Sequence, residues 1–92
     1  MENETLLFRI KFGLRIKELR TERKIEQAVL ASDLNRDKQF INRYENEGAN
    51  PRADIVQDLA QALNLDKIDE LFDFKTLKKS EIEKIYEKIK KM

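Results

Sequence analysis

The sequence predicts an all-α fold. Gly13 and Gly48 are its only glycines and Pro51 is its only proline, so few positions interrupt a helix. No stretch alternates β-branched and polar residues as a half-buried strand does, whereas apolar residues recur three and four positions apart. A chain of 92 residues has the size of one small domain with a modest core.

The first two helices are expected at about residues 6–23 and from Gln27 onward, each with apolar residues on its inner side. The sequence Asn-Arg-Asp follows the second helix and predicts a turn. Asn35 tolerates a left-handed backbone there, and Asp37 can cap the next helix.

The third helix, expected over residues 37–46, carries polar and apolar residues on opposite sides. At roughly 100° per residue, its polar residues share one arc of about 140°, which holds two cations, three carboxamides and no acid. This polar arc consists of Lys38, Asn42, Asn46, Gln39 and Arg43. Phe40, Ile41 and Tyr44 lie on the opposite side, and Glu45 lies at the border.

Three further helices are expected after the loop that contains Pro51. The fourth covers about residues 52–64 and the fifth about residues 67–72. The sixth begins with a capping box formed by Ser80 and Glu83. Its apolar stripe consists of Ile82, Ile85, Tyr86, Ile89 and Met92.

The net charge of +1 conceals a segregation of charge along the chain. Residues 9–24 hold seven lysines and arginines against two glutamates, and residues 75–92 hold seven lysines against three glutamates. Residues 53–73 hold six acids against one lysine. Such blocks fit solvated helix faces, and they also fit contact with charged partners, because the local field depends on where charges lie.

The composition argues against several classes of site. Without cysteine there is no disulfide or thiolate metal site, and without histidine the commonest general base and metal ligand are missing. We therefore expect that the protein is not an enzyme and that it binds neither a metal ion nor a cofactor. No apolar run is longer than four residues, and the bulkiest is Leu6–Phe8. We therefore expect a cytoplasmic protein with neither a membrane span nor a signal peptide.

The polar arc of the third helix has the chemistry that reading of a DNA major groove requires. Arginine and lysine bind guanine acceptors, and glutamine or asparagine can pair with adenine at two points. An arc without acids suits a surface that faces phosphates. The arc alone is weak support, because ten-residue helices without an outward acid also arise by chance.

Five short motifs occur in order between residues 12 and 72. They are GLRIKELRTERK at 13–24, QAVLASDL at 27–34, FINRYEN at 40–46, NP at 50–51 and LAQALNL at 59–65. In order and separation they resemble the phage-repressor-like (Cro/C1, xenobiotic-response-element type) helix-turn-helix family. The resemblance implies a five-helix lambda-repressor-like DNA-binding bundle over residues 1–72, with the helix-turn-helix at about 27–46. Residues 73–92 would add a C-terminal amphipathic helix.

The resemblance also implies roles for single residues. Base reading falls on Lys38, Gln39 and Arg43, with Asn42 as a further candidate. Phosphate contacts fall on Gln27 and Asn46, and Arg36 and Arg52 are additional cationic candidates. Arg20 and Glu45 match a structural ion pair between the first and third helices, which would hold the third helix in place.

Three positions depart from the family pattern. Glu26 stands where the family favours serine or threonine as a helix cap. Arg36 occupies a usually aliphatic position, which its stem could fill while its charged end points outward. Glu47 occupies a position that is often glycine, and Gly48 follows one residue later.

The sequence therefore predicts a sequence-specific DNA-binding transcriptional regulator, a repressor or autoregulator that acts as a homodimer on double-stranded DNA. A phage-type repressor, a restriction–modification controller and a toxin-binding antitoxin all fit this description. The alternative is a helical protein-interaction module with weak or no DNA binding. Residues 73–92 have two interpretations, packing on the same domain or forming the dimer interface.

Overall fold

The computed structural model describes residues 2–92; residue 1, where the predicted domain 1–72 begins, lies outside the described residues. Within 2–92 the chain forms five α-helices, one 3₁₀ helix and no strand. The elements are α1 (Glu2–Glu22), α2 (Gln27–Asp33), α3 (Lys38–Glu47), α4 (Ala53–Ala62), η1 (Ile68–Phe72) and α5 (Lys79–Lys90). The predicted all-α bundle is confirmed, with a 3₁₀ helix as its fifth element.

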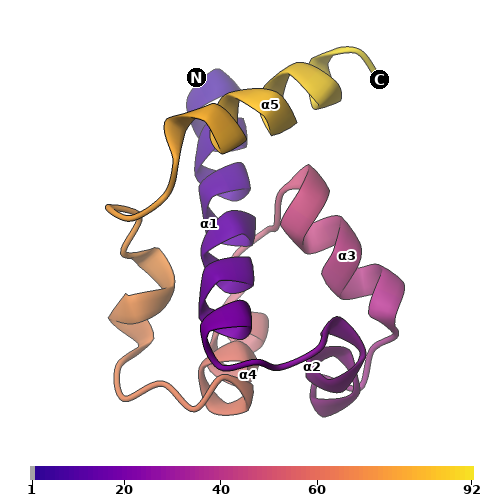
Figure 1. Cartoon of the computed structure of the whole chain (residues 1–92), viewed down its shortest axis with the longest axis vertical. Helices are drawn as coiled ribbons and strands as arrows, with labels where there is room; N and C mark the ends of the chain where they lie inside the picture. Colours follow the sequence, from indigo (N-terminus) through magenta and orange to yellow (C-terminus); the bar gives the residue numbers. More distant parts are fainter. Residues whose placement is uncertain (1) are drawn as a thin grey trace.

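The long helix α1 packs directly against α3, η1 and α5. Helix α3 runs beside it, α5 crosses near its N-terminal end, and α2 and α4 lie toward its other end (Figure 1). Helix α2 packs on α3, and η1 packs on both α1 and α4. The described residues form one compact bundle, in which α5 contacts α1 and the end of α3.

The core is apolar and draws on every element except α5. Its largest fully buried apolar side chains are Phe12, Ile16, Leu19, Leu30, Ile41, Leu59, Leu63 and Leu71. The recurrence of these residues three and four positions apart explains why each segment is helical, because one side of each helix is removed from water. The outward sides remain free to carry charge.

Helices α1 and α3 approach so closely that only glycine fits at their crossing. A Cβ atom added to Gly13 would overlap the carbonyl oxygen of Tyr44. Four residues further on, Gly48 ends α3 with a φ of 94°, and the amide of Ala49 donates to the carbonyl of Arg9 at 3.0 Å. Both contacts fix the position of α3 along α1.

The C-terminal segment is attached to α1 by aromatic and polar contacts. Phe72 stacks on Phe12 with ring centroids 5.2 Å apart, and Phe74 meets Phe8 edge-on at 5.6 Å. Thr76 donates its hydroxyl to the Glu18 carboxylate at 3.0 Å. The apolar stripe of α5 is only half-buried, and no residue of α5 is fully buried.

The predicted turn between α2 and α3 is present. Asn35 adopts a left-handed conformation with a φ of 60°. The side chain of Asp37 accepts a hydrogen bond from the amide of Phe40 at 3.0 Å, which satisfies one of the free amides at the start of α3.

Two expectations about helix starts are wrong. Helix α1 begins at Glu2, four residues before the predicted start at Leu6, and acids at this end, such as Glu4, suit a helix N-terminus. Ser80 and Glu83 form no capping box, because α5 begins at Lys79 and its N-cap is Lys78. Ser80 already lies inside the helix, two residues after the N-cap position.

We expect Gly13→Ala to destabilise the protein by about 1–3 kcal/mol or more, because the added methyl group overpacks the helix crossing. At an exposed helical site the same change would stabilise by about 1 kcal/mol. Urea denaturation of the purified variants measures the difference. Thr21→Ala, at an exposed position of α1, is the control and should change stability little; a Gly13→Ala variant as stable as the wild type would contradict the close approach.

Candidate nucleic-acid interface

The outward side of α3 presents polar side chains that the rest of the chain leaves unoccupied. Lys38, Gln39, Asn42 and Arg43 are all exposed. Within residues 2–92, none of these four side chains takes part in an ion pair or hydrogen bond. No α3 acid lies among them, since Glu45 is buried and Glu47 is at the end of the helix. They are therefore free to contact a partner.

Three of these residues share one hollow. Lys38, Gln39 and Asn42 line a shallow depression of about 250 Å³ at the N-terminal half of α3. Arg43 follows Gln39 by four residues and so continues the same side of the helix. The candidate base-reading residues thus form one surface.

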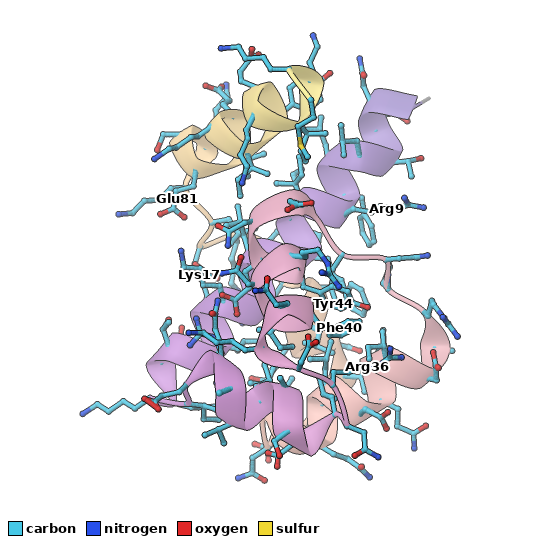
Figure 2. The ribbon with its side chains drawn as sticks, turned by 90° about the vertical axis from the view of Figure 1, so that its right-hand side faces the viewer. Arg9, Lys17, Arg36, Phe40, Tyr44 and Glu81 are labelled. Carbon is cyan, nitrogen blue, oxygen red and sulfur yellow. The ribbon has the colours of Figure 1, made fainter. Side chains whose placement is uncertain are left out.

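The opposite side of α3 is anchored by aromatic contacts. The rings of Phe40 and Tyr44 lie 4.3 Å apart, and the guanidinium of Arg36 stacks over Phe40 at 4.7 Å. Burial raises the pKa of Tyr44 above its ordinary value of 10, so its phenol is neutral at physiological pH. In Figure 2, Arg36, Phe40 and Tyr44 lie on one flank of α3 and Lys17 lies on the other.

A buried polar cluster holds the inner side of α3. Arg20 donates to Glu45 through Nε at 2.7 Å and through Nη2 at 3.0 Å, and Nη1 donates to the carbonyl of Ile25 at 2.8 Å. The amide of Gln27 donates to the same carboxylate at 3.0 Å. Glu45 is 1% exposed, so this cluster joins α1, α2 and α3 inside the protein.

The four candidate phosphate-binding residues occupy different surroundings. Gln27 is half-buried and bound to Glu45, but one amide hydrogen remains free. Asn46 donates to the carbonyl of Asn42 at 2.9 Å. Arg36 and Arg52 lie on the Tyr44 flank, where Arg36 stacks on Phe40 and Arg52 makes an exposed ion pair with Asp54 at 3.4 Å.

A helix-turn-helix family model matches residues 16–69, which contain α2, the turn, α3 and α4. The chain belongs to this helix-turn-helix family. Its members of the Cro/C1 type are DNA-binding regulators, and the family resemblance predicted from the motifs is confirmed. Comparison with curated proteins and with solved structures gives no significant match.

The match to the helix-turn-helix family ends ten residues before α5 begins. Helix α5 and the N-terminal part of α1 therefore lie outside the matched residues. Within residues 2–92, no helix combines the length and apolar character needed to cross a bilayer.

Two departures from the family pattern have visible structural effects. Glu26 is the N-cap of α2, but its side chain makes no capping hydrogen bond. Helix α3 continues through Glu47, and Gly48 then supplies the positive φ that ends the helix. The position that is often glycine in this family is thus helical, and the turn falls one residue later.

The sequence reasoning missed two residues of α1, one of which lies beside the site. Arg15 is buried, where it donates to the carbonyl of Glu70 at 2.8 Å and to Glu18 at 2.9 Å, and so links α1 to η1. Lys17 lies beside Asn46 in a groove next to α3. Lys17 follows Gly13 by four residues and so lies on the side of α1 that approaches α3, but the sequence alone does not show that approach.

We expect Glu45→Ala to destabilise the protein by about 3–5 kcal/mol, because it leaves the Arg20 guanidinium buried without a partner. Arg52→Ala is the matched control, since it removes an exposed ion pair that contributes about 0–1 kcal/mol. Both values come from urea denaturation at neutral pH. If the two variants lose equal amounts of unfolding free energy, the buried pair does not hold α3 in place.

Proposed function

We propose that the protein is a sequence-specific DNA-binding transcriptional regulator, a repressor or autoregulator, which reads its operator with α3. The observation that carries the proposal is the acid-free polar surface of Lys38, Gln39, Asn42 and Arg43, exposed on a capped helix in a chain of the helix-turn-helix family. These side chains match the donors and acceptors of base edges in the major groove.

The anchoring of α3 supports this assignment. Base reading requires side chains held in a fixed orientation, because a misplaced donor cannot make a two-point hydrogen bond. The Arg20–Glu45 pair and the close approach at Gly13 together fix the rotation and position of the helix. The proposed reading surface therefore rests on a rigid support.

We further propose that two copies bind together on a two-fold-related operator. One α3 covers only a short half-site, and helix-turn-helix proteins gain affinity and specificity by pairing half-sites. The centres of the half-sites would then lie about 34–36 Å apart, one turn of the duplex. Sedimentation of the protein with and without such a duplex measures the number of copies bound.

Selection of binding sites from random duplexes tests the proposal. At about 50 mM salt, where phosphate contacts are strong, we expect enrichment of one motif that consists of two related half-sites. The double variant Gln39→Ala/Arg43→Ala is the control and should enrich a degenerate motif. If the folded wild-type protein enriches no site, the alternative of a protein-interaction module is favoured and the proposed function is wrong.

Single substitutions assign the base contacts. We expect Gln39→Ala and Arg43→Ala each to lose about 1–3 kcal/mol of discrimination at one base pair, because each removes a two-point contact. Competition between the selected operator and its single-base variants measures this discrimination. If a variant loses affinity for DNA without any change in base preference, the substituted residue does not read a base.

The role of Lys38 is assigned from two properties of DNA binding by the Lys38→Ala variant, its salt dependence and its base preference. If Lys38 reads a base, Lys38→Ala relaxes the preference at one position and leaves the others unchanged. If it binds phosphate, the variant weakens binding uniformly and reduces the salt slope by about 1. Binding titrations at several salt concentrations distinguish the two roles, and a variant that changes neither quantity would place Lys38 outside the interface.

A further inference from the structure

A groove adjoins the C-terminal end of α3, where α1, α3 and α5 meet. It has a volume of about 430 Å³ and receives side chains from all three helices. Lys17 of α1, Asn46 of α3, and Lys84 and Lys88 of α5 supply polar and cationic groups, and Glu81 is the acid that faces it. The apolar part of the wall comes from Leu14 and Ile85.

The groove carries a positive charge that the chain itself does not neutralise. Among the described residues 2–92, Lys17, Lys84 and Lys88 form no ion pair with any acid. The three lysines outweigh Glu81, which leaves an excess of two positive charges. Such a local excess attracts a polyanion.

The groove is continuous with the proposed reading surface of α3. Asn46 lines the groove and also belongs to the polar arc of α3, where its amide bonds to the carbonyl of Asn42. Asn42 in turn lines the depression that contains Lys38 and Gln39. Lys17 and Glu81 lie on the same flank of α3, away from Arg36, Phe40 and Tyr44 (Figure 2).

The two lysines of α5 have a spacing that suits a phosphate backbone. Lys84 and Lys88 are four residues apart, so they lie on the same side of α5 with a rise of about 6 Å between them. Successive phosphates of one DNA strand advance by about 3.4 Å along the duplex axis. The separation of the two lysines is close to two such steps, so a strand that runs along this side of α5 would bring phosphates near both.

We propose that this groove binds the DNA backbone beside the half-site read by α3, with Lys84 and Lys88 as the phosphate contacts of α5 and Lys17 beside them. The proposal rests on the proposed function, since it extends the same DNA interface. Helix α5 lies outside the family match, so the match itself does not account for this contact. It supplies affinity without sequence preference.

The test is the salt dependence of DNA binding by the full chain, measured by fluorescence anisotropy on the selected operator and on an unrelated duplex. For the double variant Lys84→Gln/Lys88→Gln, we expect the slope of log affinity against log salt to fall by about 1.8 per bound protomer. Between 50 and 200 mM salt, the wild type should then lose about 12-fold more affinity than the variant. The base preference should not change.

The matched control is Lys90→Gln/Lys91→Gln, which removes the same charge from the last residue of α5 and its C-cap, both outside the groove. Its salt slope should stay close to that of the wild type. An unchanged slope for Lys84→Gln/Lys88→Gln, or an equal change in the control, would overturn the inference while leaving operator binding intact. Thermal denaturation checks that both variants are folded.

Two further outcomes separate this inference from the proposed function. If the wild-type chain binds neither duplex, the proposed function fails and the inference fails with it. If Lys84→Gln/Lys88→Gln instead shifts the sedimentation of the free protein from dimer to monomer, the groove is a contact between two copies and not a phosphate site. Specific binding with a reduced slope in this variant alone supports the phosphate contact.

Discussion

The placement of α3 depends on the carboxylate of Glu45. Both of its oxygens accept hydrogen bonds inside the protein, from Arg20 of α1 and from Gln27 of α2. Any rotation of α3 would separate a buried negative charge from its donors, which is far more costly than the loss of an exposed ion pair. One residue on the inner side of the helix therefore determines which residues lie on its outer side.

Steric contact complements this electrostatic restraint. At Gly13, the backbones of α1 and α3 are too close for any side chain, so the distance between the helices is set independently of the charges. The same helix α1 carries Phe8 and Phe12, which hold the segment that leads to α5. The outer surface of α3 and the lysines of α5 thus share one support, and this allows a single partner to contact both.

Hydrophobic periodicity was sufficient to predict the helices and their order, because each helix buries one side in a common core. The outward arc of α3 followed from its angular spacing, and the pairing of Arg20 with Glu45 was indicated by family resemblance. The contact of Arg15 with the Glu70 carbonyl joins positions 55 residues apart and has a backbone acceptor, so no side-chain pattern marks it. The groove beside Asn46 likewise depends on how three helices cross, which one-dimensional spacing does not specify.

The absence of any fully buried residue in α5 has a dynamic consequence. A helix that removes little apolar surface from water gains little free energy by docking, so it opens locally more often than α1 or α3. The backbone amide hydrogens of α5 would accordingly exchange with solvent faster than those of the core helices, because the free energy of local opening is lower. A polyanion bound along its lysines would favour the docked helix by mass action and slow that exchange.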